Sequence, residues 1–362
     1  MAANQDLRPS EGEPAPPADE FPRKILEYLE GFYISKTVFT SCELGVFDVL
    51  LAAERPMSAE EISQAVGASL DGTQRLLAAC SGLELLNVHQ EGEQVFYSNT
   101  DQARVYLTRS SPRSLYQCTQ YSSKTIYRCW NYLTDAVREG KNQYEKAFGV
   151  SSKDLFQAIY SSDEEMVRFM QMMNYIWNIC GKDVVTAFDL SPFKDICDLG
   201  GCTGALAKHF TSAYPECNVT IFDLPKVARM ARQHFVKEAD QRISFHEGDF
   251  FKDSLPAADL YILARILHDW TDERCIELLS RIYKACKPGG SVLLVEALLN
   301  EDGSGPLTVQ LYSLNMLVQA EGRERTATQY TALLAGAGFT NIQHRLTGKL
   351  YDVVLGHKNE EK

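Results

Sequence analysis

The sequence lacks the features that mark a membrane protein, a secreted protein or a zinc protein. No apolar run reaches the roughly 18 residues that a bilayer requires, and no basic segment followed by an apolar one stands at the amino end. The ten cysteines are scattered, without C-x-x-C pairs and without a cluster of cysteine and histidine. We therefore expect a cytosolic protein whose cysteines are free, buried thiols, with no disulfide and no bound metal.

Basic charge is scarce as well. The 36 lysines and arginines face 48 aspartates and glutamates, which gives a formal net charge of −12, and no basic patch is concentrated in the chain. Binding to nucleic acid or to an anionic membrane needs such a patch, so we expect neither as a partner. Small neutral or cationic ligands suit this charge better. With 362 residues, 45% of them hydrophobic, the chain is long enough for two or three domains.

The first two segments of the chain differ in composition. Residues 1–20 contain four prolines, several acids and almost no large apolar side chain, which predicts a disordered tail. From Phe21 the pattern becomes helical, and apolar residues occupy more than one face: Ile25, Leu29, Phe32, Phe39, Val46, Phe47, Val49 and Leu50. A helix of this kind must be buried on more than one side, often against a second subunit. We therefore expect a homodimer formed through this region.

Residues 21–115 together indicate a winged-helix-like domain. Ser58 opens a helix with a capping-box pattern, residues 71–86 continue as a third helix, and residues 88–98 form two short strands. A winged helix often binds DNA, but the segment 57–100 contains one arginine and six acids, a net charge of −5. Phosphates would repel that charge, so a role in dimerisation or as a lid fits better.

Residues 116–184 form a predicted helical linker. Ser162 caps a helix whose apolar residues recur at helical spacing: Met166, Phe169, Met170, Met173, Ile176, Trp177 and Cys180. A stripe of this kind usually packs into a core. Its three methionines also suit an adaptable apolar pocket for a flat ring, so the linker is expected to contribute to a substrate pocket.

The domain from residue 185 to residue 362 alternates strands and helices. This alternation predicts a parallel sheet that is covered by helices on both faces. The last two apolar runs, residues 340–347 and 350–357, are separated only by Gly348 and Lys349, so they form a hairpin and the final strand is antiparallel. In a sheet of this kind, ligands bind at the carboxyl ends of the parallel strands.

A glycine-rich stretch at residues 195–210 reads D-I-C-D-L-G-G-C-T-G-A-L-A-K-H-F and indicates a strand, a tight turn and a helix. Such a turn lets backbone N–H groups approach a nucleotide closely. Asp223 ends the next predicted strand, where a carboxylate accepts hydrogen bonds from both ribose hydroxyls. Cys202 interrupts the G-x-G-x-x-G pattern, which favours a nucleoside without a pyrophosphate, such as S-adenosylmethionine, over a dinucleotide. An ordinary turn without a ligand is the alternative.

His268 is the candidate for the chemistry. It follows the apolar strand 258–264 together with Asp269, at the edge where ligands bind, and a neutral imidazole there can take a proton from an aryl hydroxyl. Glu296 ends the next strand and is expected to hydrogen-bond the other ring nitrogen, and Glu324 is a second candidate for that bond. The alternatives are a structural histidine, a surface carboxylate at a strand end and a solvated charged loop.

These motifs, in this order, resemble the S-adenosylmethionine-dependent O-methyltransferases of the plant caffeate and animal hydroxyindole type. The resemblance spans residues 21–357 and rests on the glycine turn and four further motifs: Gly248-Asp249-Phe250, Leu267-His268-Asp269-Trp270, Lys287-Pro288-Gly289-Gly290 and Gly322-Arg323-Glu324-Arg325-Thr326. Residues 127–130, 135–144 and 311–319 are similar to the hydroxyindole branch in particular. The resemblance implies an α/β fold, in which a Rossmann-like methyltransferase sheet, mostly parallel, follows a helical winged-helix-like dimerisation domain.

The resemblance also implies roles for individual residues. The methyl donor, S-adenosylmethionine, is expected to contact Tyr160, Trp177, Gly200, Asp223, Gly248, Asp249, Phe250 and Arg265. His268 is expected to act as the base, with its ring held by Glu296 and Glu324. The acceptor, a hydroxyindole that is methylated on its 5-hydroxyl, is expected to hydrogen-bond Asp269, Asn315 and Gln319. The resemblance implies no metal.

Two residues depart from the family pattern. Cys202 stands where many relatives have glycine, which bears on the fit of the donor's methionine end. Ala320 stands directly after Gln319, where threonine is expected.

Three other functions remain as alternatives at this point. A related methyltransferase that acts on a different phenol would share every motif except the acceptor pocket. A catalytically silent relative would serve as a binding protein, although His268, Asp269, Glu296 and Glu324 are all present. A nucleotide-dependent dehydrogenase is the third.

Overall fold

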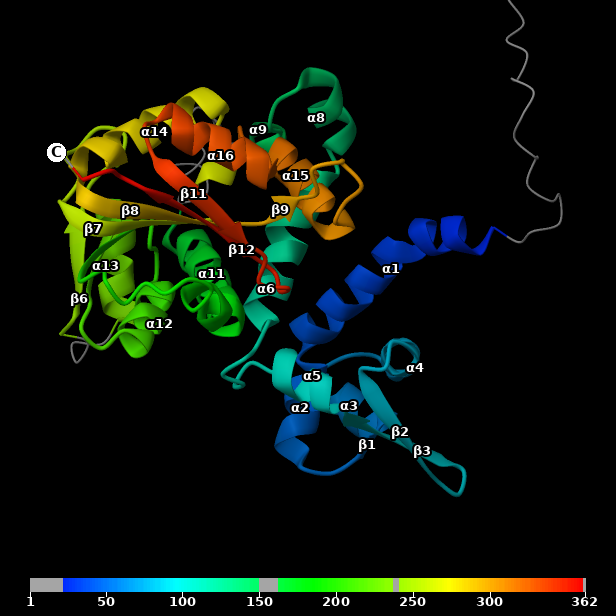
Figure 1. Cartoon of the computed structure of the whole chain (residues 1–362). Coiled ribbons are helices and arrows are strands. Elements are labelled where there is room, and N and C mark those ends of the chain that lie inside the picture. Colours follow the sequence, from blue (N-terminus) through cyan, green and yellow to red (C-terminus); the bar gives the residue numbers. More distant parts are fainter. Residues whose placement is uncertain (1–21, 150–161, 237–240, 361–362) are drawn as a thin grey trace, which may run out of the picture.

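The structure is a computed structural model that describes residues 22–149, 162–236 and 241–360. Within them, a small amino-terminal domain is joined by helices to a larger domain built on a seven-stranded sheet (Figure 1). The predicted disordered tail, residues 1–20, and the predicted donor-binding residue Tyr160 lie outside the described residues.

The amino-terminal domain has the predicted winged-helix arrangement of helices and a hairpin. Its helices are α1 (Arg23–Leu44), α2 (Val46–Ala53), α3 (Ala59–Val66), α4 (Leu70–Gly82) and α5 (Asp101–Tyr106). Its strands, β1 (Met57–Ser58), β2 (Leu86–Glu91) and β3 (Gln94–Asn99), form an antiparallel sheet in the order β1-β3-β2.

Local sequence signals explain where the third and fourth helices begin and end. The predicted capping box is present at α3, because the Ser58 hydroxyl accepts from Glu61 N while the Glu61 carboxylate accepts from Ser58 N. The prediction of one helix over residues 71–86 is wrong in its length. Helix α4 ends at Gly82, Glu84 adopts a left-handed conformation (φ 58°) that interrupts the helix, and Leu86 begins β2.

Helix α1 extends away from the rest of its domain (Figure 1). Large apolar residues along its first half are 49–65% exposed: Ile25, Tyr28, Leu29, Phe32, Tyr33 and Ile34. Its last turn instead packs into a core, where Cys42 lies with Phe47 and Leu50 of α2. The apolar face of α1 therefore has no cover within the described part of a single chain.

The linker between the domains is helical, as predicted. It contains α6 (Tyr116–Tyr121), the π-helical turn η1 (Ser122–Ile126), α7 (Tyr127–Trp130), α8 (Leu133–Glu139), α9 (Tyr144–Phe148) and α11 (Asp163–Val185). Ser162 caps α11, because its hydroxyl accepts from Glu165 N.

The larger domain has the predicted α/β fold. Its main strands are β4 (Asp195–Leu199), β5 (Asn218–Asp223), β6 (Ile243–Glu247), β7 (Ala258–Ala264), β8 (Cys286–Glu296), β11 (Thr340–Arg345) and β12 (Asp352–His357). They lie in the order β11-β12-β8-β7-β4-β5-β6. The strands from β8 to β6 pair in parallel, whereas β12 is antiparallel to both β8 and β11, which confirms the predicted hairpin. Two short strands, β9 (Leu298–Leu299) and β10 (Arg325–Thr326), form a separate parallel pair.

Helices cover both faces of this sheet (Figure 1). They are α12 (Ala205–Ala213), α13 (Pro225–His234), α14 (Asp272–Ala285), α15 (Leu307–Gln319) and α16 (Ala327–Gly336), together with α11. In the central strand β7, Leu260 and Ile262 pack with α11 and α12, while Tyr261 and Leu263 pack with α14 and α16. Successive side chains of a strand point to opposite faces, so a strand that is apolar throughout must be covered on both.

Two further observations concern the chain as a whole. No described helix is both long enough and apolar enough to span a bilayer. The ten cysteines are free thiols, and nine of them are buried.

Candidate active site

The glycine turn connects β4 to α12, as predicted. Gly200 and Gly204 adopt left-handed conformations (φ 70° and 74°), and a Cβ on Gly200 would lie 2.5 Å from Ile266 Cδ1. A side chain at position 200 would strain the backbone and displace the end of Ile266, so glycine is favoured there. Cys202 is also left-handed (φ 50°) although it is not glycine, and its N–H donates to Asp223 Oδ2 at 2.8 Å. This hydrogen bond ties the turn to the end of β5.

A cavity of about 240 Å³ lies beside this turn, at the carboxyl ends of the parallel strands. Six of the eight predicted donor-binding residues line it: Gly200, Asp223, Gly248, Asp249, Phe250 and Arg265. Asp269, a predicted acceptor-binding residue, lines it as well. The strand ends therefore bring together side chains from distant parts of the sequence, as the parallel topology requires.

Three further predicted binding residues that the structure describes lie outside this cavity. Trp177 is buried between α11 and the sheet, where its ring packs beside Tyr351. Asn315 and Gln319 lie on α15, where Gln319 Nε2 donates to Asn315 Oδ1 at 2.5 Å. Their roles in ligand binding stay predictions. Ala320 is buried in an apolar cluster, and nothing in the structure explains why alanine stands there.

The methionine stripe of α11 divides between two surroundings. Met166 and Met170 are fully buried in a cluster with residues of α13. Phe169 and Met173 line the cavity instead. The apolar stripe of α11 therefore contributes to the core and also to an apolar wall of the cavity. Helical periodicity alone does not distinguish these two roles, because one face of a helix is wide enough for residues of both kinds.

Two buried carboxylates lie next to the glycine turn. Asp223 accepts from Cys202 N and Leu224 N at 2.8 Å each, and burial raises the pKa of its carboxyl to about 6. Asp198, on β4, is fully buried, and neither of its carboxylate oxygens has a hydrogen-bond partner among the described residues. Burial, and after it the charge of Asp223, raises the pKa of Asp198 to about 7. The sequence prediction missed Asp198, although it stands directly before the turn in D-L-G-G.

The Asp198 carboxyl is expected to make the folded protein less stable as pH rises. Its pKa of about 7 lies above the ordinary value near 3.9 of an unfolded chain, so the folded state binds this proton more tightly. The stabilisation is present below about pH 4 and is lost as pH rises through 7. We expect Asp198→Asn to raise the stability of the ligand-free protein at pH 8 by on the order of 1–3 kcal/mol.

Thermal unfolding at pH 8 and pH 5 tests this expectation. The stabilising effect of Asp198→Asn should be much smaller at pH 5, where the wild-type carboxyl is already protonated. Asp101→Asn, at an exposed position in α5, is the control and should change little at either pH. Equal melting temperatures of wild type and Asp198→Asn at pH 8 would contradict the assignment of a charged, unpaired carboxylate.

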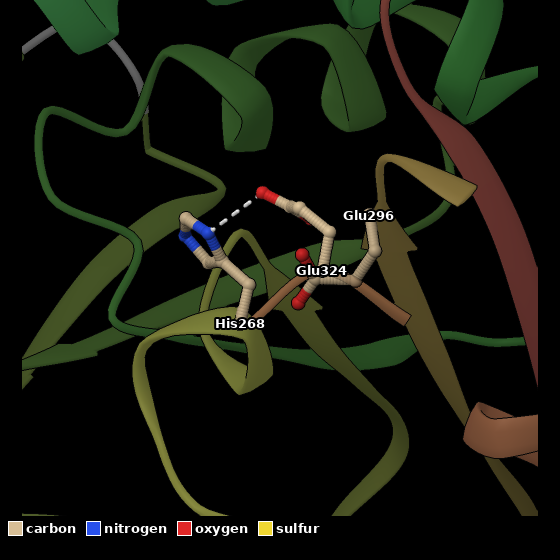
Figure 2. Close-up of side chains that lie close together, drawn as sticks. All are labelled: His268, Glu296 and Glu324. Carbon is tan, nitrogen blue, oxygen red and sulfur yellow. Dashed lines mark hydrogen bonds and ion pairs between the residues drawn. The ribbon is translucent and has the colours of Figure 1, made fainter. Parts of the chain in front are cut away.

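His268, Glu296 and Glu324 meet in a buried cluster (Figure 2). His268 lies in the short 3-10 helix η2 (Leu267–Asp269) after β7, Glu296 ends β8, and Glu324 directly precedes β10. His268 Nδ1 lies 3.2 Å from Glu324 Oε1. The ring contact that the sequence assigns first to Glu296 is thus made by the second candidate, Glu324. Glu296 accepts instead from Leu267 N at 3.0 Å and from Arg265 Nη1 at 2.9 Å.

Arg265 supplies the positive charge of this cluster. Its Nη1 donates to Glu296 Oε2 and Glu324 Oε2 at 2.9 Å each, and its Nη2 lies 2.8 Å from His268 Nδ1. Burial lowers the pKa of Arg265, but Glu324 and Glu296 outweigh it and raise the pKa overall, so the guanidinium stays charged. Burial likewise opposes the ionisation of Glu324, but Arg265 and His268 outweigh it and lower the pKa of Glu324 to about 2. The side-chain nitrogen and oxygen atoms of His268, Glu296 and Glu324 are close enough together to hold a metal ion. The guanidinium of Arg265 lies among these atoms instead and supplies the positive charge.

The hydrogen bonds allow His268 two neutral forms. In one form Nε2–H donates to Arg265 O at 3.1 Å and Nδ1 accepts from Arg265 Nη2. In the other form Nδ1–H donates to Glu324, and Nε2 carries a lone pair that can take a proton. This form requires Arg265 Nη2 to move away from Nδ1, because both nitrogens would then be donors. Only the second form is a base at Nε2.

The surroundings of His268 raise its pKa. Burial is the largest influence on the pKa of His268 and lowers it, as does Arg265, but Asp269 and Glu324 outweigh both and the pKa is raised. The ring is 7% exposed and is not itself a lining residue of the cavity. Its Nε2 lies 3.5 Å from Asp269 Oδ1, and Asp269 does line the cavity. The His268 ring therefore lies behind Asp269, which forms part of the cavity wall, and its Nε2 points toward Asp269.

Arg325 and Gly322 hold the loop that carries His268. Arg325 is 1% exposed, and it donates to Leu267 O at 2.9 Å and to Trp270 O at 2.8 Å. A Cβ on Gly322 would lie 2.2 Å from His268 O, so only glycine lets the two chain segments pass this closely. The G-R-E-R-T motif therefore fixes the loop in addition to supplying Glu324.

Comparison with known proteins identifies the family. A family model of an O-methyltransferase domain matches residues 130–340, and a model of an O-methyltransferase dimerisation domain matches residues 26–109. The chain belongs to the O-methyltransferase family. The predicted O-methyltransferase class is confirmed, and so is the α/β fold with an amino-terminal dimerisation domain.

Individual members of the O-methyltransferase family match over nearly the whole chain. Acetylserotonin O-methyltransferase of Gallus gallus is 60% identical over 339 residues, which cover 94% of this chain and 98% of that protein. Acetylserotonin O-methyltransferase of Homo sapiens is 52% identical over 340 residues, covering 94% and 99%. Among solved structures, human N-acetylserotonin methyltransferase in complex with SAM has a TM-score of 0.92 and 51% identity, covering 95% of this chain and 99% of that one.

Proposed function

We propose that this chain transfers the methyl group of S-adenosylmethionine to the 5-hydroxyl of N-acetylserotonin, giving melatonin and S-adenosylhomocysteine. The observation that carries the proposal is the buried pair of His268 and Glu324 beside a cavity at the carboxyl ends of the strands. The reaction named for the relatives that are 52–60% identical supports the same donor and acceptor.

The residues around the cavity fit the donor. Gly200 and Gly248 present bare backbone, since a Cβ there would lie 2.5 Å from Ile266 and 2.6 Å from Phe222. Asp223, Asp249 and Phe250 line the cavity. In the proposed complex Asp223 binds the ribose hydroxyls, and Asp249 and Phe250 contact the adenine ring. S-adenosylmethionine supplies a methyl group on a positively charged sulfur. The buried carboxylates beside the turn suit a ligand of that charge.

His268 acts as the general base. An aryl hydroxyl has a pKa near 10, within reach of an imidazole that contacts it once the His268 ring turns from behind Asp269 toward the cavity. Nε2 takes the proton, while Nδ1–H donates to Glu324, whose negative charge stabilises the imidazolium. Glu296 acts through Arg265 and Leu267 N, so it positions the loop rather than the ring. Asp269, Asn315 and Gln319 hydrogen-bond the acceptor, and positioning supplies most of the acceleration.

Mass spectrometry of the product tests the proposed reaction. The protein is incubated with S-adenosylmethionine, N-acetylserotonin and a mixture of competing phenols and catechols. We expect melatonin as the main product, at a rate that a metal chelator leaves unchanged, because Arg265 supplies the cation of the cluster. Preferred methylation of another phenol would reassign the acceptor, and the absence of any methylated product would refute the enzyme function.

A homodimer formed through the amino-terminal domain is a further part of the proposal. The match to a dimerisation domain and the exposed apolar face of α1 support it. We expect the double variant Leu29→Asp/Phe32→Asp to weaken the dimer by at least about 10⁴-fold, because four apolar side chains, two from each subunit, are withdrawn at about 1.5–3 kcal/mol each. Light scattering after gel filtration should show monomers at micromolar concentration. Gln90→Asp on the exposed hairpin should remain dimeric, and a dimeric double variant would refute this interface.

We also place the protein in the cytosol. Free thiols persist in a reducing compartment, and all ten cysteines of this chain are free. A nucleic-acid partner is not expected, because the net charge of −12 would repel phosphates.

A further inference from the structure

The indole of Trp130 fixes the orientation of two side-chain amides. Trp130 ends α7, and its Nε1 lies 2.8 Å from the side-chain oxygen of Asn315 on α15. An indole N–H only donates, so the Asn315 atom that faces it must be Oδ1. Gln319 reaches the same oxygen at 2.5 Å and must therefore present its Nε2. One donor on α7 thus sets which way both amides point.

The atoms that these bonds leave unused are Asn315 Nδ2, a donor, and Gln319 Oε1, an acceptor. Within the described parts of the chain neither atom has a hydrogen-bond partner, and neither is among the polar atoms sealed from solvent. A secondary amide carries the matching pair, a carbonyl acceptor and an N–H donor. A protonated amine carries only hydrogen-bond donors, so it cannot accept a hydrogen bond from Asn315 Nδ2.

The helix that carries the two amides ends beside the cavity. Helix α15 ends at Gln319, and two residues later Glu321 lines the cavity and donates its N–H to Asp269 O at 3.3 Å. Tyr312 precedes Asn315 by three residues on the same face of the helix and packs against the core of the sheet. Helix α15, which carries the unused donor and acceptor, therefore ends two residues before a segment that contacts Asp269 at the cavity.

We propose that Trp130 sets the acceptor specificity by fixing the orientation of the Asn315 and Gln319 amides. In this orientation the site selects hydroxyindoles whose side chain carries a secondary amide over hydroxyindoles with a free amine. This inference rests on the proposed methyltransferase function and concerns the same site. Trp130 acts through the two amides, so it is a positioning residue. Without its N–H, the Asn315 amide is free to turn over and to offer its oxygen in place of its NH2.

The test compares N-acetylserotonin with serotonin in Trp130→Phe, which keeps the aromatic ring and removes the N–H. We expect the ratio of the two kcat/KM values to fall by about 10-fold, mainly through a higher KM for N-acetylserotonin, as suits the loss of one oriented hydrogen bond. Turnover at saturation and affinity for S-adenosylmethionine should stay within about 2-fold of wild type. Tyr132→Phe removes a polar group from the same apolar cluster and should leave the ratio unchanged.

The outcomes separate this inference from the function on which it rests. If wild type methylates N-acetylserotonin but Trp130→Phe lowers both kcat/KM values equally, the role of Trp130 is structural and the inference is overturned. If wild type methylates neither indole, the proposed function falls and the inference with it. If Trp130→Phe fails to fold, Asn315→Asp replaces it in the test, because aspartate keeps the side-chain oxygen and removes the NH2 donor. Asn315→Asp must then lower the ratio of the two kcat/KM values. An unchanged ratio overturns the inference.

Discussion

His268→Ala is expected to lower the turnover of N-acetylserotonin by about 10²–10⁴-fold, the usual contribution of one general base. The variant has no group at the position of Nε2 that can take the phenolic proton. Its affinity for S-adenosylmethionine should stay close to that of wild type, because His268 does not line the cavity. Single-turnover rates measure the first effect, and calorimetric titration with the donor measures the second.

The pH profile adds an independent check on His268. The base must be neutral to act, and the pKa of His268 is raised, so wild-type activity should increase with pH through a midpoint above the ordinary value near 6.5. His268→Ala should lose this rising limb. His344→Ala, at an exposed position on β11, is the matched control and should keep both rate and profile. A His268→Ala enzyme that works at wild-type rate from pH 6 to pH 9 would exclude the ring as the base.

Arg265→Met should lower the free energy of unfolding by about 3–5 kcal/mol, because it leaves Glu296 and Glu324 buried without their cation. Methionine keeps a flexible side chain of similar length, so the loss reports the charge more than the packing. Urea denaturation at pH 7 measures the change. The double variant Arg265→Met/Glu324→Gln should recover part of the loss, since it removes one of the two uncompensated charges.

A surface arginine provides the control for Arg265. Arg323 pairs with Asp272 at 2.9 Å, but its side chain is 53% exposed, so Arg323→Met should cost at most about 1 kcal/mol. If Arg265→Met unfolds at the same urea concentration as wild type, the buried ion pairs are not what stabilises the cluster. An effect as small as that of Arg323→Met would lead to the same conclusion.

Much of the fold could be predicted because its signals are local. The apolar strand at residues 258–264 is β7 in the structure, and the hairpin at the carboxyl end is β11 and β12, since strand period and turn residues act over a few positions. The third helix was predicted too long because leucines continue past Gly82. Glu84 adopts a left-handed conformation that interrupts the helical pattern. The spacing of apolar residues does not reveal this conformation.

The candidate site was predictable in its members more than in its contacts. Asp223 and Asp269 line the cavity because Asp223 ends one parallel strand and Asp269 follows another. Which carboxylate meets His268 depends on how two strand ends and a distant loop pack, and Glu324 rather than Glu296 makes the bond. Trp177 shares a face of α11 with Met173 but lies one turn further along the helix, where it packs beside Tyr351 and does not line the cavity.

The sequence by itself determined the alternating α/β topology, the glycine turn and the placement of a histidine at the ligand edge, because periodicity and turn chemistry are properties of neighbouring residues. Only the tertiary structure decided that Arg265 stands among Glu296, Glu324 and His268, and that the Trp130 indole orients Asn315 from 185 residues away. Those contacts join segments far apart in the chain, and they depend on distances of about 3 Å that no spacing along a sequence specifies.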